Sequence, residues 1–438
     1  MSCCCSLGNV NRSAREPRFF LGWIVVAVAG LVAFTEVAFF NPVLGVFIPE
    51  FEREFGWSRT EISLGVTVGS LVGAAISPFL GPLIDRYGGR MFVAGGTALT
   101  AVALVLLANM QTEWQFFLIY GLGRGTASGL ITLAATVTVS KWFVRRRGFA
   151  VGVTTLGSRA GFALLPISVQ LLIDAQGWRT AVYALALTVG TIGVLPVLKW
   201  FHAKPEDFGL EPDGDAAMPV VGSAQYHVAQ REISWSRADA LRTRSFWLIT
   251  GSLSLLNFAT GAVNLHQIPH LVDSGLQPAQ AALIISLLAV FSAAGALIEG
   301  VIDAKFGARR TLMLAMLVSA GGMVVLMNTT TVWMGVAYAG VYGLAFGLMI
   351  TSNQIVFAEY YGREALGAIR GAAAPFQMAL NSVGPIVAGL AFDLTGSYLA
   401  AFVPFTGCYL IAAAALAVAH RPPLPAHVRV QTAPEAAG

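Results

Sequence analysis

Long stretches without a charged residue restrict what this chain can fold into more than any other feature of its sequence. Seven of them run for 19 residues or more, among them 62–84, 91–112 and 245–272, and an eighth, 311–358, is long enough for two membrane crossings. A helix needs about 20 apolar residues to cross the hydrocarbon layer of a bilayer. Only 11% of the residues are charged, against about a quarter in soluble domains. Most of the surface is therefore expected to face lipid.

Single charges interrupt three further apolar stretches, near Glu36, Arg124 and Arg159. The stretches are continuously apolar, whereas the strands of a membrane barrel alternate, and lipid tolerates only helices or closed barrels. The sequence therefore predicts an all-α membrane protein with twelve transmembrane helices. The predicted spans are 20–47, 62–83, 91–110, 115–139, 148–172, 180–200, 246–268, 279–301, 311–328, 332–357, 372–393 and 398–419.

The distribution of Lys and Arg predicts the orientation, because cytoplasmic loops carry an excess of both. With the N-terminus inside, 22 of the 27 fall in cytoplasmic segments and three in outer loops. We therefore expect a multi-pass protein of the cell (inner) membrane with both termini cytoplasmic. The first apolar stretch is too long for a cleavable signal peptide. No Cys lies in an outer loop, so no disulfide framework is predicted.

The two halves of the chain repeat one another. Asp85 recurs as Asp303 at an offset of 218, and Tyr120 recurs as Tyr342 at an offset of 222, each within a matching local sequence. Parallel six-helix repeats are a known transporter architecture. The predicted organisation is a cytoplasmic tail (1–18), a six-helix bundle (19–201), a polar cytoplasmic linker (202–243), a second six-helix bundle (244–419) and a cytoplasmic tail (420–438).

The loop after the second predicted helix carries a motif whose residues each have an identifiable physical role. Its Gly residues allow close packing and chain reversal, its Asp can accept hydrogen bonds at a neighbouring helix N-terminus, and its Arg can pair with acids. The motif resembles the signature loop of the major facilitator superfamily, which implies that it closes the cytoplasmic side in the outward-facing state. The gating residues so predicted are Gly81, Asp85, Gly88 and Arg90, with Asp303 and Arg309 in the second copy.

A finer resemblance is to the bacterial monocarboxylate and oxalate–formate antiporter branch of that superfamily. Its marks are Gly22-Trp23, 55–59, 141–143, 177–179 and 366–371. The resemblance implies transport of a small organic anion. The Arg that this branch places in its eighth helix is absent from 291–298, and the Lys of some members in the first or eleventh helix is absent as well.

Three charged residues are predicted near the middle of the membrane. A charge there costs at least about 2.5–3.5 kcal/mol, so such residues face the interior and are functional candidates. Glu36 and Arg124 are expected to pair and to serve proton coupling at Glu36. Arg124 or Arg159 could instead bind an anionic substrate, since Arg presents a planar fork to a carboxylate. The alternative is a buried structural ion pair.

The second half offers neutral polar groups instead. Ser254, Asn257, Gly261 and Asn264 share one helix face, and they suit either substrate binding or contacts between helices. We expect Asn257, Asn264, Asn381 and Tyr120 to contact substrate, with Gln377 a further candidate. Glu299 is expected near the cytoplasmic latch, and His266 and His270 at the outer membrane interface. Helix interruptions are predicted at Asn41-Pro42, Pro166, Pro196 and Gly384-Pro385.

Together these features predict a secondary active transporter that alternates access and moves a small organic anion, expected to be a monocarboxylate, with protons. The alternatives are an exporter of a drug-like compound or metalloid species, and a non-transporting membrane sensor. No enzymatic motif, cofactor site or metal site is predicted; Cys3, Cys4 and Cys5 are adjacent and cannot easily converge on one ion. The expected partners are a solute, protons and the lipid bilayer, without nucleic acid, and the chain is expected to be a monomer.

Overall fold

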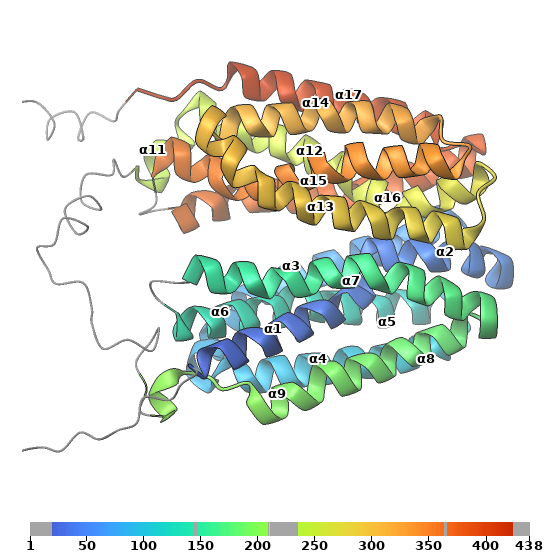
Figure 1. Ribbon diagram of the computed structural model, residues 1–438, viewed down its shortest axis with the longest axis horizontal. Coiled ribbons are helices and arrows are strands. Elements are labelled where there is room, and N and C mark those ends of the chain that lie inside the picture. The colour runs from blue at the N-terminus through green and yellow to red at the C-terminus, as the bar shows by residue number, and fades with distance from the viewer. Residues whose placement is uncertain (1–19, 144–146, 209, 211–234, 363–365, 424–438) are drawn as a thin grey trace, which may run out of the picture.

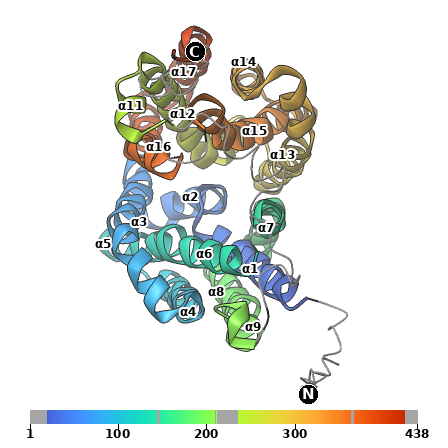
Figure 2. The ribbon, with the colours of Figure 1, turned by 90° about the vertical axis from the view of Figure 1, so that its left-hand side faces the viewer.

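A computed structural model describes residues 20–143, 147–208, 210, 235–362 and 366–423. These residues form helices joined by short turns, arranged as two bundles that lie side by side (Figure 1). Seen from the end, each bundle contributes its own ring of helices (Figure 2). The predicted N-terminal tail, most of the predicted linker and most of the C-terminal tail fall outside the described residues.

The first bundle contains six spans, three of which are built from more than one helical segment. Its elements are α1 (Gly22–Glu36), η1 (Val37–Phe39), α2 (Asn41–Phe55), α3 (Arg59–Tyr87), α4 (Gly89–Ala108), α5 (Glu113–Gly125), η2 (Thr126–Ile131), α6 (Thr132–Trp142), α7 (Arg147–Gln176), α8 (Trp178–Thr188), η3 (Val189–Val194) and α9 (Leu195–Trp200).

The second bundle contains six continuous helices, preceded by the short elements η4 (Pro205–Phe208) and α11 (Arg237–Leu241). Its helices are α12 (Arg244–Asp273), α13 (Pro278–Phe306), α14 (Ala308–Met327), α15 (Val332–Tyr361), α16 (Leu366–Thr395) and α17 (Leu399–Val418). Among the described residues, 11 helical segments are long and apolar enough to cross a membrane. Helix α3, which packs against α5, completes the predicted twelve.

The repeat predicted from the sequence extends to the backbone angles of the turns. Gly88 (φ 81°, ψ 146°) ends α3, and Gly307 (φ 79°, ψ 151°) ends α13 in the same way. Asn109 (φ −105°, ψ 5°) and Asn328 (φ −104°, ψ 6°) end the helices that follow. Both pairs are 219 residues apart, so the two bundles are copies of one fold.

Of the predicted helix interruptions, Asn41-Pro42 has the largest effect on the backbone. Phe40 is extended (φ −95°, ψ 159°) and separates η1 from α2. Pro42 has no N–H, so it cannot continue the hydrogen bonding of the preceding helix. Pro196 follows the π-helical turn η3, whereas Pro166 and Pro385 lie inside the unbroken helices α7 and α16.

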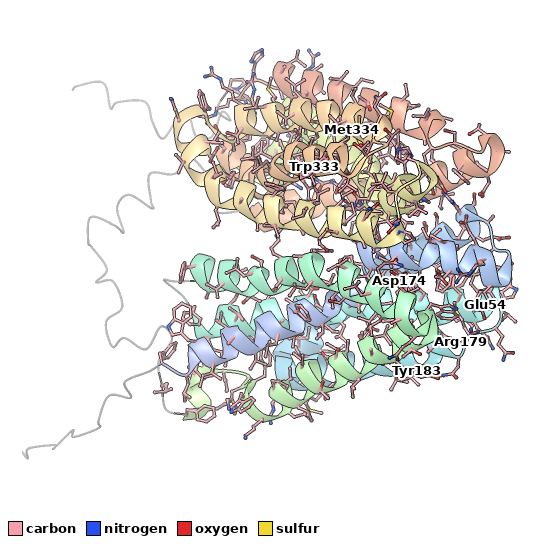
Figure 3. The ribbon with its side chains drawn as sticks, turned by 45° about the vertical axis from the view of Figure 1, so that its right-hand side comes forward. Glu54, Asp174, Arg179, Tyr183, Trp333 and Met334 are labelled. Carbon is pink, nitrogen blue, oxygen red and sulfur yellow. The ribbon has the colours of Figure 1, made fainter. Side chains whose placement is uncertain are left out.

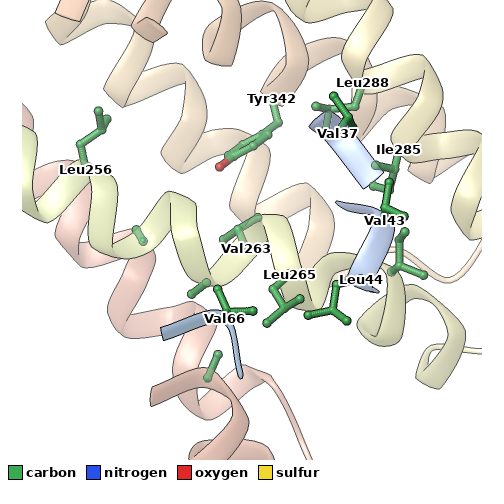
Figure 4. Packing of buried hydrophobic residues seen from close by; sticks show 14 of the residues in the cluster. Val37, Val43, Leu44, Val66, Leu256, Val263, Leu265, Ile285, Leu288 and Tyr342 are labelled. Carbon is green, nitrogen blue, oxygen red and sulfur yellow. The ribbon is translucent and has the colours of Figure 1, made fainter. Parts of the chain in front are cut away.

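The two bundles meet mainly through three helix pairs, α2 with α12, α3 with α16, and α7 with α13, and α2 also touches α13. Apolar side chains fill much of this junction, where Figure 4 shows Val43 and Leu44 of α2 facing Ile285 of α13 and Leu265 of α12. We call the end of the molecule at which α9 ends and α12 begins the linker end, and the opposite end the far end. The bundles lie closest together toward the far end (Figure 1).

Helices α1 and α7 approach one another so closely that their contact requires glycine. A Cβ atom at Gly157 would overlap the carbonyl oxygen of Gly30 on α1. Such small-residue contacts are typical of helix packing in membranes, where van der Waals contact replaces the hydrophobic effect. This contact fixes α7, the helix that carries Arg159.

Replacing Gly157 by Val should therefore destabilise the protein, by about 1–3 kcal/mol, because α1 and α7 must separate to admit the side chain. The apparent melting temperature of the purified protein in detergent measures the effect. Gly152→Val on the same helix is the control, since a Cβ at Gly152 meets no atom within 4 Å. Equal melting temperatures for the two variants would contradict the prediction.

Candidate functional site

Two cavities lie between the bundles, and each is lined by one arginine: Arg124 is buried, and Arg159 is partly buried. The Arg159 chamber has a volume of about 250 Å³ and is lined by α7 and α12 among others. The Arg124 chamber has a volume of about 300 Å³ and is bounded by α5, α12 and α16. Phe40, which lines the Arg124 chamber, and Phe162, which lines the Arg159 chamber, stack edge to face with their ring centroids 5.9 Å apart. This aromatic pair stands between the two chambers.

The guanidinium of Arg159 has few protein partners. Its Nη1 donates to Ser292 Oγ of the opposite bundle at 3.3 Å, and it makes no other hydrogen bond or ion pair with a described residue. A guanidinium carries five N–H groups, so four stay available in the chamber. The remaining walls are mostly apolar, with Phe162, Ile285, Leu288, Phe346 and Ile350. Asn264 and Gln267 add polar groups, and no acidic side chain is among the described residues that line the chamber.

Arg124 is more completely bound than Arg159. Its Nη1 donates to the carbonyl oxygen of Phe39 at 2.9 Å, and its Nε donates to Ser70 Oγ at 3.1 Å. The Phe39 carbonyl is available because the helix breaks directly after it. The chamber beside Arg124 is more polar than the other and is lined by Ser128, Asn257, Gln377 and Asn381.

The structure does not form the predicted ion pair between Glu36 and Arg124. Glu36 is 7% exposed, and its Oε2 accepts a hydrogen bond from Thr132 Oγ1 at 3.0 Å. Thr132 lies eight residues beyond Arg124, or about 12 Å along a helix. The carboxyl is thus turned toward Thr132, while the guanidinium bonds the Phe39 carbonyl, and the two make no ion pair in this conformation.

The other residues predicted to contact substrate are divided among several places. Asn257 and Asn381 line the Arg124 chamber, and Asn264 lines the Arg159 chamber. Asn381 Nδ2 also donates to the Asn257 carbonyl at 3.0 Å, so this pair joins α12 to α16. Tyr120 lines neither chamber: it is buried, and its hydroxyl donates to the Phe39 carbonyl at 2.9 Å.

The predicted gating residues make contacts within their own bundles. The Arg90 side chain donates to the Leu198 carbonyl, and Arg309 Nη2 donates to the Ala417 carbonyl at 2.9 Å. Asp303 Oδ1 is buried and has no hydrogen-bond partner among the described residues, so the expected contact with a helix N-terminus is missing there. Gly88 adopts the predicted reversal, with its positive φ. The surroundings of Gly81 and the side chain of Asp85 fall outside what the structure describes.

A junction between the bundles at the far end was not predicted. Arg59, the first residue of α3, is 4% exposed. Its Nη1 and Nη2 donate to the two carboxylate oxygens of Asp273 on α12, at 2.5 and 3.1 Å, and its Nε donates to Glu52 at 2.6 Å. The guanidinium carbon lies 3.7 Å from the centroid of the Phe392 ring. One buried cation thus holds α2, α3, α12 and α16 together.

Asp393 of α16 strengthens this far-end junction. Its Oδ1 accepts from the backbone N–H of Arg59 at 3.2 Å, and its Oδ2 accepts from that of Thr60 at 3.0 Å. A carboxylate from the second bundle therefore binds the positive N-terminal end of a helix of the first bundle. The sequence pattern Ser58-x-x-Glu61, which forms a capping box, could have placed Arg59 in the first turn of a helix rather than in an outer loop.

A second ion pair at the far end joins α2 to α8. Glu54 of α2 accepts from Trp178 Nε1 and pairs with Arg179 of α8, both at 2.5 Å (Figure 3). This contact lies within the first bundle. Glu52 of α2 thus supports the arginine that reaches the second bundle, whereas Glu54 contacts only residues of the first bundle.

The two histidines of α12, which the sequence predicts near the outer membrane interface, are buried within the protein near the far end. His266 is 0% exposed; the Tyr398 hydroxyl lies 2.8 Å from its Nδ1, while the Pro385 carbonyl and Ser63 Oγ lie 3.0 and 3.1 Å from its Nε2. A neutral ring with its proton on Nε2 satisfies all these partners. His270 bonds the Leu326 carbonyl. Both rings therefore help to pack the far end.

Glu299 is buried within the second bundle, where Ser352 Oγ donates to its Oε1 at 3.2 Å. It makes no hydrogen bond with a gating residue among the described residues, but Asp303 lies one turn further along the same helix, so its place in a latch stays a prediction. In the part of the chain that the structure describes, no cluster of three or more His, Cys, Asp or Glu side chains could hold a metal ion.

Comparisons with known proteins agree with this architecture. A family model described as Major Facilitator Superfamily matches residues 22–270 and 248–437. Monocarboxylate transporter 11 of Mus musculus is 26% identical over 407 residues, which cover 90% of this chain and 86% of the relative. Monocarboxylate transporter 13 of Bos taurus is 28% identical over 408 residues, covering 91% and 89%. The crystal structure of the nucleoside transporter NupG matches with a TM-score of 0.67 at 16% identity, over 92% of this chain and 100% of that one.

Replacing Arg59 by Gln should destabilise the protein by about 2 kcal/mol, because Asp273 and Glu52 lose their cation in a largely buried place. The expected loss of stability is smaller than for a fully buried ion pair because both acids keep some access to solvent. The apparent melting temperature in detergent measures it. Arg53→Gln, at a salt bridge whose arginine side chain is 75% exposed, is the control, and equal effects of the two changes would refute the role of Arg59.

Proposed function

The chain belongs to the major facilitator superfamily, and from this premise we propose that it is a secondary active transporter of small monocarboxylates. Members of this superfamily are transporters, and the curated relatives named above support the predicted monocarboxylate branch. One observation carries the choice of substrate: the guanidinium of Arg159 faces a small chamber between the bundles with a single hydrogen bond to the protein.

The chemistry of the Arg159 chamber selects for a small anion. An arginine with free N–H groups can bind a carboxylate through two parallel hydrogen bonds. The mostly apolar walls of the chamber suit a short hydrocarbon chain and supply few donors for a multiply charged oxyanion. A volume of about 250 Å³ is below the range of about 300–1,000 Å³ that holds drug-sized ligands. These features favour a monocarboxylate over the drug-like or metalloid substrates considered above.

The distribution of contacts between the bundles supports alternating access. Within the described part of the chain, the hydrogen bonds that join the bundles run from the middle of the membrane, at Arg159 and Ser292, to the far end, at Arg59 and Asp273. We therefore assign this conformation to the state closed at the far end. Because most Lys and Arg lie toward the linker end, that end is assigned to the cytoplasm of a cell membrane. Transport then requires the far-end junction to open.

Glu36 is the proposed site of proton coupling. Its carboxyl is buried in the first span and has one neutral hydrogen-bond partner, Thr132, and no cation within ion-pairing distance among the described residues. Buried acids of this kind mark proton pathways in many transporters. Arg124 contacts the Phe39 carbonyl one turn away, so a shift of the broken first span moves Glu36 relative to Arg124. Proton binding at Glu36 would thereby be linked to the conformation of the bundle.

The substrate assignment predicts a large effect at Arg159. Arg159→Ala should lower the apparent affinity for a monocarboxylate about 100-fold, because a bidentate charge-assisted contact is lost. Arg159→Lys should keep part of it, since Lys retains the charge but not the planar fork. Flux of a panel of labelled carboxylates into proteoliposomes measures these changes, with Arg179→Ala at the far-end surface as the control. Absence of carboxylate flux, or wild-type flux in both Arg159→Ala and Arg124→Ala, would exclude an anion transporter.

The coupling assignment predicts that Glu36→Gln separates transport from the proton gradient. Net uptake driven by a pH difference should fall to the rate seen without one, while exchange of substrate across the membrane continues. Parallel flux assays with and without a pH gradient measure both. Glu299→Gln, another buried carboxyl with one hydroxyl partner, should leave coupling intact. If Glu36→Gln still couples transport to the pH gradient, the proton must bind at another residue.

A further inference from the structure

A third cavity lies away from the two chambers, on the side of the second bundle. This cleft has a volume of about 400 Å³, opens between α12, α16 and α17, and is lined by apolar side chains that include Trp247, Leu255, Phe376 and Leu380. Gln377, Met378 and Asn381 of α16 line the Arg124 chamber instead, so the cleft lies on another face of that helix. All described residues that line the cleft belong to the second bundle, so the cleft lies outside the path between the bundles and, in a bilayer, would face lipid.

Two buried hydroxyl groups line this cleft without a partner. Thr250 is 2% exposed and Ser254 is 5% exposed, and neither hydroxyl oxygen makes a hydrogen bond with a described residue. By contrast, Ser252, which also lines the cleft, donates to the Ala412 carbonyl at 2.7 Å. A buried hydroxyl without a partner is costly, so Thr250, the nearer of the two to the start of α12, is positioned to meet a hydrogen-bonding group of a molecule in the cleft.

The mouth of the cleft is basic and aromatic. Arg242 and Arg244 are exposed where α12 begins, and neither makes an ion pair or hydrogen bond with a described residue. Arg244 lies one turn before Trp247 and Leu248 and therefore on the same helix face as the cleft. Trp247 and Phe376 meet edge to face, with centroids 5.6 Å apart, and about half of each side chain is exposed. Trp and Arg at one level are typical of the membrane interface.

We propose that this cleft is a binding site for an anionic phospholipid. The phosphate group is held by Arg244 and Arg242, and one acyl chain lies along α12 between Trp247, Phe376 and Leu380. Thr250 lies about 9 Å beyond Arg244 along the helix, and it donates to an ester oxygen of the lipid, whereas Ser254, about 15 Å beyond Arg244, lies at the level of the acyl chain. The charge of the mouth favours an anionic head group over a zwitterionic one.

Quenching of tryptophan fluorescence tests the proposal directly. The purified full-length protein in a neutral detergent is titrated with phosphatidylglycerol whose acyl chains carry bromine, and with phosphatidylcholine of the same chains. We expect saturable quenching by the anionic lipid that is lost in Trp247→Phe, and at least roughly tenfold weaker binding of the zwitterionic lipid. Equal binding of the two lipids would refute an anion-selective site.

A variant that fills the cleft provides a matched comparison. A Cβ at Gly251 meets no atom within 4 Å, and Gly251 lines the cleft, so Gly251→Leu should abolish the saturable quenching without a clash. Gly321→Leu, at an equally open and exposed position of α14, should bind as the wild type does. Wild-type binding by Gly251→Leu would overturn the proposal.

The charged mouth is tested separately, so that the proposal does not depend on one variant. Arg242→Gln combined with Arg244→Gln should weaken binding of phosphatidylglycerol roughly 30-fold, since each cation near the membrane surface contributes a factor of about five. Inorganic phosphate at millimolar concentration should not displace the lipid. Full displacement by phosphate, or unchanged affinity in the double variant, would assign the site to something other than a phospholipid.

Discussion

The hydrocarbon layer offers no hydrogen-bond partners, so the protein itself must satisfy the backbone polar groups inside it. The break in the first span shows how this constraint shapes the structure. Where Asn41-Pro42 ends the helical bonding, the Phe39 carbonyl accepts from both Arg124 and Tyr120, and the Asn41 side chain donates to the Gly261 carbonyl of the opposite bundle. The broken helix, the buried cation and the contact between bundles therefore depend on one another.

Arg124 and Arg159, the arginines that line the two chambers, differ in how many of their N–H groups the protein satisfies. Arg124 is bound by the protein, whereas most of the N–H groups of Arg159 are free in its chamber. The second bundle repeats the fold of the first, as the matching turns at Gly88 and Gly307 demonstrate. Its contribution to the chambers consists of neutral groups such as Asn257, Asn264 and Ser292. Duplication thus preserved the backbone while the chemistry of the two halves diverged.

The fold and its repeat were predictable because they follow from local properties, namely apolar length and turn residues. The details of the site were not, because they depend on where a side chain points. Residue spacing placed Glu36 and Arg124 near the middle of the membrane, but it could not show that Glu36 turns toward Thr132. Tyr120 was expected to contact substrate, yet its hydroxyl donates to a backbone carbonyl of the first span. The role of Arg59 could not be predicted because its partners Asp273 and Asp393 are more than 200 residues away in sequence.

The helices that form the far-end junction also line the chambers. Helix α12 carries Asn257 and Asn264 in the chambers and Asp273 at the junction. Helix α16 likewise carries Asn381 at one level and Asp393 at the other. Because each is a single continuous helix, opening the Arg59 junction must displace the chamber walls as well. A solute that binds between Arg159 and Ser292 joins the same two bundles, so its binding energy acts on the same movement.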